Sequence, residues 1–130
     1  MTSSPDLVSS ETSRGAAILI LDHDDGEREL LGYWLVEQGF AVLDAADSAE
    51  ALELFHAHPQ ALVLLDRQTE ASSPVLAQLR GVNPGLRCCL LGCDEPPHDV
   101  AHCFPKPLSL FDLTAVLCQL AAEVVHVERG

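Results

Sequence analysis

Short apolar runs alternate with longer amphipathic segments along most of this chain. The runs at 18–21 (ILIL) and 62–65 (LVLL) are bounded by polar residues, a pattern typical of strands buried on both faces of a sheet. Each run is followed directly by an acidic residue, Asp22 or Asp66. In an open parallel sheet the ligand crevice lies outside the carboxyl ends of the strands, so the pattern predicts that both carboxylates lie at that rim.

Strands and helices are predicted to alternate along the rest of the chain. Strands are expected at 18–21, 40–43, 61–66, 86–91 and 101–104. Helices are expected at about 25–38, from the Asp47–Glu50 capping box to Pro59, from Ser73 and Pro74 to Gly81, and from the Ser109–Asp112 capping box onward. The segment 94–100 (DEPPHDV) is too short and too rich in proline for a full helix.

The last predicted helix is apolar on more than one face. Its first stripe contains Leu110, Leu113, Leu117, Leu120 and Val124, and its second contains Phe111, Ala115, Cys118, Ala122 and Val125. One stripe must pack on the sheet, and the second needs a cover of its own. We therefore expect a homodimer through this helix and the fifth strand, although small residues such as alanine are also ordinary on a surface.

Composition bounds the fold and excludes some partners. With 130 residues and 48% hydrophobic content, the chain suits one compact domain after a disordered leader at 1–14. The formal charge of -13 repels phosphate backbones, so no direct contact with nucleic acid is expected. No segment is apolar enough for a membrane helix or a secretion signal, which predicts a cytoplasmic protein. Five cysteines without such a signal predict free thiols rather than a disulfide framework.

Three separated motifs resemble the receiver domains of bacterial two-component response regulators. They are ILILDHDDGERELL, ALVLLD and FPKPLSLFDLTAVL, and the resemblance covers about 16–122. It implies an α/β fold with a doubly wound five-stranded parallel sheet in the flavodoxin-like order 2-1-3-4-5, with the receiver domain over 15–127. It also implies a signalling module that is no enzyme, apart from Mg²⁺-assisted self-phosphorylation and dephosphorylation.

The resemblance assigns the chemistry to acids and one lysine. It implies that Asp66 accepts a phosphoryl group from a partner histidine kinase, with Mg²⁺ held by the acidic cluster that includes Asp22. It places Lys106 beside the phosphoryl group, and Pro107 after a peptide bond that is often cis in this fold. Phosphoryl transfer to a carboxylate needs these groups because a hard cation and an ammonium neutralise the charge on the phosphoryl oxygens.

The first departure from the family concerns the metal. His23 stands where the family has a second acid that binds Mg²⁺ directly, and Mg²⁺ prefers oxygen ligands. We therefore expect Mg²⁺ to be weakly bound or absent. Asp24 or Asp25 is a candidate replacement ligand, but Asp24 with Glu27 three residues later is also the pattern of a helix N-cap, and we favour capping.

The second departure concerns the residues that transmit the signal. Gly92 stands where the family has a Thr or Ser whose hydroxyl bonds the phosphoryl group, and Cys103 stands at the aromatic switch position. The loop after Asp66 lacks the usual pattern. The segment from Gly92 to Lys106 is shortened by about two helical turns, so the fourth helix of the family is expected to be absent or much reduced.

These departures favour a pseudo-receiver, whose output depends weakly or not at all on phosphorylation and acts through protein contact. The alternative is a conventional phosphoreceiver with Asp66 as nucleophile. Lys106 then has two interpretations, a phosphoryl ligand or a structural counter-ion for the acids.

Two other functions are weaker. The run LILDHDDG resembles the Asp-x-Asp motif of haloacid-dehalogenase phosphatases, but no second acidic pair follows Lys106. A metal or redox site is suggested by Cys93, His98, His102 and Cys103, although their spacing does not match a structural zinc site.

Overall fold

The computed structural model of this protein describes residues 17–95 and 100–129. Within them five parallel strands form one sheet in the order β2-β1-β3-β4-β5, as the sequence resemblance implied. The strands are β1 (Ile18–Leu21), β2 (Val42–Ala45), β3 (Leu62–Asp66), β4 (Cys88–Leu91) and β5 (His102–Phe104). The helices are α2 (Asp25–Glu37), α3 (Ser48–Ala57), α4 (Arg67–Ser72), α5 (Leu76–Val82) and α6 (Leu110–Arg129).

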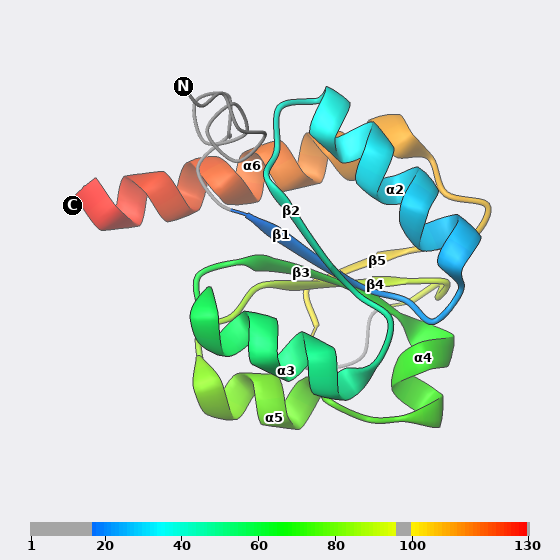
Figure 1. Ribbon diagram of the computed structural model, residues 1–130. Coiled ribbons are helices and arrows are strands. Elements are labelled where there is room, and N and C mark those ends of the chain that lie inside the picture. Colours follow the sequence, from blue (N-terminus) through cyan, green and yellow to red (C-terminus); the bar gives the residue numbers. More distant parts are fainter. Residues whose placement is uncertain (1–16, 96–99, 130) are drawn as a thin grey trace, which may run out of the picture.

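Helices cover both faces of the sheet. Helices α2 and α6 lie over one face, α3 and α5 lie over the other, and α4 lies at the end of the sheet where β3 stops (Figure 1). Successive residues of β1 point to opposite sides: Ile18 and Ile20 pack in the core under α2 and α6, while Leu19 and Leu21 pack in the core under α3 and α5. Burial on both faces explains why this strand is an uninterrupted apolar run, as predicted.

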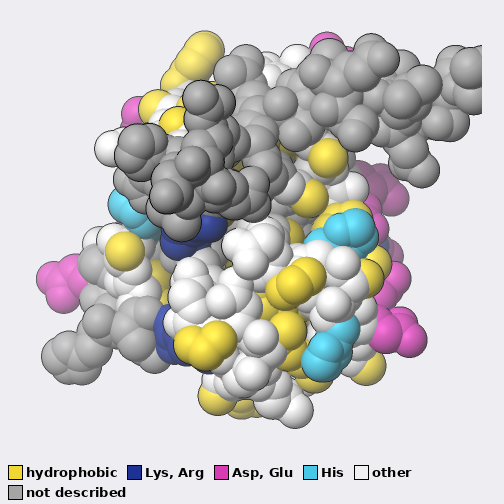
Figure 2. Space-filling view, turned by 90° about the vertical axis from the view of Figure 1, so that its left-hand side faces the viewer, with side chains coloured by type: hydrophobic (Ala, Val, Ile, Leu, Met, Phe, Trp, Pro, Cys, Tyr) yellow, Lys and Arg dark blue, Asp and Glu magenta, His cyan; other side chains and the backbone are white. Residues whose placement is uncertain are grey.

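The end of the molecule at which the strands begin differs from the acidic rim. Figure 2 looks onto this end, where hydrophobic, histidine and a few basic side chains are visible and acidic side chains lie at the margin of the view. Asp22 and Asp66 lie at the other end, because each follows or closes a strand. The two acids expected from the sequence therefore lie at the carboxyl ends of the strands, where a parallel sheet has its ligand crevice.

Helix capping followed the sequence pattern at three helices. The side chain of Asp24 accepts a hydrogen bond from the backbone nitrogen of Glu27, and that of Asp47 accepts one from Glu50. At α6 the backbone nitrogen of Asp112 lies 3.3 Å from the hydroxyl of Ser109. Capping is local, since it joins residues three apart, and this is why the sequence could predict it.

Three predicted boundaries were wrong. The strand expected at 40–43 is displaced to Val42–Ala45. Ser73 and Pro74 do not start a helix, because α5 begins at Leu76, and Gly81 lies inside that helix. The residues expected to form a loop after Asp66 instead form α4, because the carboxylate of Asp66 supplies its N-cap.

The connection between β4 and β5 and the strand that follows it are less covered than the central strands of the sheet. Its described residues, 92–95 and 100–101, form no helix, in agreement with the expected loss of the family's fourth helix. Strand β5 lies at the edge of the sheet, and all of its residues are half-buried. This edge is therefore less covered than β1 and β3, whose residues are buried throughout.

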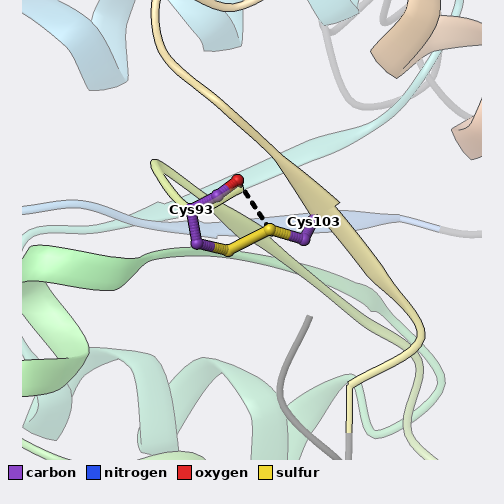
Figure 3. The surroundings of a disulfide bond; sticks show 2 residues. All are labelled: Cys93 and Cys103. Carbon is purple, nitrogen blue, oxygen red and sulfur yellow. Dashed lines mark hydrogen bonds between the residues drawn. A yellow bond between two sulfur atoms is a disulfide. The ribbon is translucent and has the colours of Figure 1, made fainter. Parts of the chain in front are cut away.

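The expectation that all cysteines are free thiols was wrong. Cys93 and Cys103 form a disulfide with a Cα–Cα distance of 5.9 Å (Figure 3), while Cys88, Cys89 and Cys118 take part in no disulfide. The two residues are brought together because β4 and β5 are neighbours and Gly92, with φ of 94°, turns the chain at the end of β4. A pairing that depends on which strands are neighbours leaves no mark in the cysteine spacing.

None of the described helices combines the length and apolar character needed to cross a membrane. The predicted disordered leader at 1–14 lies outside the described residues, as do His98 and the side chains of Val124 and Val125.

Candidate functional site

Two buried carboxylates lie at the ends of adjacent strands. Strands β1 and β3 pair in register, with Leu21 opposite Leu65, so Asp22 and Asp66 are brought to the same rim. Asp22 is fully buried and Asp66 is 2% exposed. One ligand atom from each of Asp22, His23 and Asp66 lies within 4.8 Å of the others. The structure therefore assembles the group that the sequence motifs pointed to.

Both oxygens of Asp66 already have partners. Its Oδ1 accepts a hydrogen bond from Lys106 Nζ at 2.6 Å, and its Oδ2 accepts bonds from the backbone nitrogen and the hydroxyl of Thr69 at 2.9 and 3.0 Å. Burial alone would raise the pKa of Asp66, but the bonds from Lys106 and Thr69 outweigh it and hold that pKa below its usual value. Asp66 is thus an ionised carboxylate that accepts hydrogen bonds at both oxygens.

Lys106 joins two acids across the rim. Its ammonium lies 2.6 Å from Glu27 Oε1 as well as from Asp66 Oδ1, and its peptide bond to Pro107 is cis, as the family resemblance implied. Burial would lower the pKa of Lys106, but both carboxylates raise it above its usual value. The lysine therefore remains charged and neutralises two acids that would otherwise repel each other.

Gly92 lies against the side chain of Lys106. A Cβ atom added at this glycine would lie 3.5 Å from Cε of Lys106, an ordinary contact distance, whereas the backbone φ of 94° disfavours any other residue. The backbone conformation, rather than the space beside the lysine, therefore accounts for glycine at this position.

Asp22 has the opposite environment to Asp66. Its Oδ1 accepts a hydrogen bond from the backbone nitrogen of Asp24 at 2.9 Å, whereas its buried Oδ2 has no hydrogen-bond partner among the described residues. Burial, together with the neighbouring carboxylates of Glu27 and Asp66, raises the pKa of Asp22 to about 7. Without a cation, Asp22 is therefore largely protonated at slightly acid pH.

His23 is tied to Asp66 through Thr69. The hydroxyl of Thr69 lies 3.0 Å from Asp66 Oδ2, 3.1 Å from the backbone nitrogen of His23 and 2.6 Å from His23 Nδ1. An ionised carboxylate only accepts, so the hydroxyl donates its single hydrogen to Asp66 and accepts from both nitrogens. His23 Nδ1 therefore carries a hydrogen, and Nε2 is the ring nitrogen left for a metal or a proton.

The donor set fits a divalent cation only in part. The unpartnered, buried Oδ2 of Asp22 is the kind of atom that a cation satisfies. Asp66, however, is bonded at both oxygens, and His23 offers nitrogen where Mg²⁺ prefers oxygen. Asp24 does not join the group, because its carboxylate caps α2.

Sequence reasoning missed two residues of this site, Thr69 and Glu27. Thr69 is 4% exposed, lies three residues after Asp66 and so has the spacing of a capping partner, a signal that was available in the sequence. Glu27 was assigned to a capping box, but the backbone nitrogen of Asp24 bonds Asp22 and the Glu27 carboxylate binds Lys106. That contact joins residues 79 positions apart, so no local pattern indicates it.

Solved receiver structures share this architecture. The Vibrio cholerae chemotaxis protein CheY4 is similar with a TM-score of 0.70 at 18% identity, over 80% of this chain and 97% of that chain. The CheY-like receiver domain protein from Methanospirillum hungatei JF-1 has a TM-score of 0.72 at 18% identity, over 85% and 97%. The receiver domain of the hybrid histidine kinase CckA has a TM-score of 0.66 at 22% identity, over 80% and 97%.

The chain has the fold of a response-regulator receiver domain. No protein-family model matches the sequence, and no curated protein matches it either. The receiver fold is thus carried by a sequence with little identity to these solved receivers, and the site must be judged on its own residues.

Proposed function

We propose that this receiver domain is a pseudo-receiver, a signalling module of a two-component pathway whose output comes from protein contact and depends little or not at all on phosphorylation. The observation that carries this proposal is the state of Asp66 Oδ2, which accepts bonds from both the backbone nitrogen and the hydroxyl of Thr69 and so caps α4. An oxygen whose two lone pairs are both engaged cannot attack phosphorus without losing a bond. Phosphorylation at Oδ2 would therefore break the cap of α4.

The changed switch positions support the same proposal. Gly92 has no hydroxyl to bond a phosphoryl group, and Cys103 replaces the aromatic side chain that moves in the family. His23 weakens the set of oxygen ligands for Mg²⁺, so we propose that Mg²⁺ is bound weakly or not at all. In these terms the chain is not an enzyme.

A conventional phosphoreceiver is the second candidate, favoured by the close contact of Lys106 with Asp66. In that mechanism a freed oxygen of Asp66 attacks the phosphorus of a phosphohistidine in a kinase, and Lys106 neutralises the charge that the phosphoryl oxygens bring. A bound Mg²⁺ would supply further charge neutralisation, held by Asp22 and Asp66.

Beryllofluoride with Mg²⁺ separates these two candidates, because it mimics the phosphoryl group without a kinase. For the pseudo-receiver we expect no shift of the amide signals of Asp66 and Thr69 at millimolar reagent. A double variant with His23→Asp and Thr69→Ala restores an acid and removes the hydroxyl bond to Asp66 Oδ2 while keeping the backbone bond, and it should respond. A saturating response of the unmodified chain, absent from Asp66→Asn, would reject the pseudo-receiver.

Partner binding is proposed through helix α6 and strand β5. Phe111 of α6 is 81% exposed and stacks edge-on with Trp34 at a centroid distance of 6.1 Å, and Ala115 on the same stripe is exposed. A second copy of the chain would cover this stripe and the half-buried edge strand. The upstream partner is a histidine kinase or another signalling protein, and with a charge of -13 the chain is not expected to bind nucleic acid.

Analytical ultracentrifugation tests the dimer. The expected result is a concentration-dependent dimer that Phe111→Ser weakens, while Tyr33→Ser, an exposed aromatic on α2, leaves it unchanged. Sedimentation as a monomer at tens of micromolar would reject it.

A further inference from the structure

We propose that Cys93 and Cys103 form a reversible disulfide site, so that thiol oxidation sets the position of β5, the strand that leads into Lys106. This inference rests on the proposed function, because it assigns a regulation to a site whose phosphoryl relay is lost. It concerns a covalent modification that does not use Asp66.

Cys103 stands at one of the two switch positions that the family resemblance implies, and Cys93 follows the other, Gly92. Cys93 directly follows Gly92 at the end of β4, and Cys103 lies in the middle of β5, the neighbouring strand. Both are half-buried, and Figure 3 shows their side chains meeting across the gap between the two chain segments. A bond between them therefore joins the loop after β4 to the edge strand, where the structure describes no covering helix.

A short series of contacts connects this pair to the acidic rim. The backbone nitrogen of Gly92 donates a hydrogen bond of 2.7 Å to the carbonyl of Phe104, the residue after Cys103. Gly92 also lies against the Lys106 stem, and the Lys106 ammonium binds Asp66 and Glu27. Fixing Cys93 to Cys103 therefore restrains the backbone at Gly92 and at Phe104, the two segments next to the Lys106 side chain, and reduction releases this restraint.

The other three cysteines are in no disulfide. Cys88 and Cys89 are buried in β4, and burial raises the pKa of the Cys89 thiol to about 12, which suppresses its reactive thiolate form. Cys118 lies on α6 and is free. Oxidation should thus be selective for the pair Cys93 and Cys103.

Thiol–disulfide exchange with a low-molecular-weight disulfide accounts for the chemistry. The thiolate of one cysteine attacks the small disulfide, forming a mixed disulfide and releasing one small thiol. The second cysteine, after losing its proton, attacks the protein sulfur of the mixed disulfide and releases the second small thiol. Two protein thiols are thereby oxidised and one small disulfide is reduced to two thiols.

In the reduced form a hydrogen bond between Cys103 and Cys93 can replace the disulfide. Sγ of Cys103 lies 2.6 Å from the carbonyl oxygen of Cys93, the contact drawn dashed in Figure 3. A thiol can donate its hydrogen to this oxygen, whereas a disulfide sulfur has none to donate. Reduction therefore replaces a covalent link by a weak hydrogen bond and loosens the two segments without separating them.

Thiol counting tests the site directly. The intact chain is equilibrated with oxidised or reduced glutathione, alkylated after denaturation and mapped by mass spectrometry. We expect five alkylated cysteines after reduction and three after oxidation, with Cys93 and Cys103 protected. Cys118→Ser should keep this two-thiol difference, and Cys93→Ser should abolish it.

Amide signals of Lys106 and Asp66 test the coupling to the rim. They should shift between the oxidised and reduced chains and stay constant in Cys93→Ser. An unchanged thiol count overturns the site, and protected thiols without a shift at Lys106 overturn the switch. A beryllofluoride response at Asp66 would instead reject the proposed function and leave the thiol count unaffected.

Discussion

The carboxyl ends of β1 and β3 place chemically identical groups in neighbouring positions, yet the two groups behave oppositely. Asp66, at the end of β3, receives bonds from an ammonium, a hydroxyl and a backbone nitrogen, and its pKa is lowered. Asp22, after β1, receives one backbone bond, faces other acids, and its pKa rises to about 7. Burial is common to both, so the number of donors rather than burial decides which carboxylate is charged.

This difference has a functional meaning. Asp66 maintains the structure, because it caps α4 and binds Lys106. Asp22 stores an unsatisfied oxygen at the place where a cation or a proton can bind. Asp66, which the family resemblance implies as nucleophile, is therefore held in place by its hydrogen bonds. The neighbouring Asp22 is the carboxylate that can take up a cation or a proton.

Removing the lysine should have the largest effect. Lys106→Met leaves Asp66 and Glu27 without their cation and should lower the free energy of unfolding by about 2–3 kcal/mol, less than for a fully buried pair because Lys106 is partly exposed. Urea denaturation at pH 7 measures it. The control is Lys106→Met combined with Asp66→Asn, which should recover part of the loss. An unchanged midpoint in Lys106→Met would show that Asp66 does not depend on the ion pair.

Removing the charge at Asp22 should have the opposite sign. Asp22→Asn abolishes a buried carboxylate without its full set of bonds and should raise the free energy of unfolding at pH 8 by about 1–2 kcal/mol when no divalent metal is present. Asp66→Asn under the same conditions should destabilise the protein. If both variants changed stability in the same direction, the contrast between the two strand ends would be refuted.

The hydroxyl of Thr69 should matter less. Thr69→Val keeps the shape and the backbone cap but removes the hydroxyl bond to Asp66 and the acceptor for His23, and should cost about 1 kcal/mol. Thr69→Ser retains the hydroxyl and should be close to the unmodified protein. Thermal unfolding followed by circular dichroism compares the two, and equal loss in both would indicate a packing effect.

The pH dependence should show both carboxylates with opposite signs. Between about pH 4 and pH 7 the folded protein holds a proton on Asp22 that the unfolded chain has released, so stability should fall as pH rises through this window. Asp66 has a lowered pKa, so its contribution is present above its unfolded value of 3.8 and is lost as pH falls below it. Urea midpoints across pH should flatten in the first window for Asp22→Asn and in the second for Asp66→Asn.

The sequence by itself determined the elements whose cause is local. Ile18–Leu21 and Leu62–Asp66 are strands because each contains an uninterrupted run of four apolar residues, and Asp24 and Asp47 cap helices because the bonded nitrogen is three residues away. The motifs around Asp22, Asp66 and Lys106 were sufficient to infer the strand order. These features depend on residues that are close in the chain or on a resemblance that covers most of it.

Tertiary structure decided the chemistry of the site. Lys106 meets Glu27 from 79 positions away, Thr69 meets His23 from 46, and Cys103 meets Cys93 across two strands. The helix after Asp66 was also missed, because the acid was taken as a free strand end and not as a cap. Such contacts depend on which strands are neighbours and on the direction of each side chain at the site. The hydrophobic periodicity of the sequence predicts neither of these.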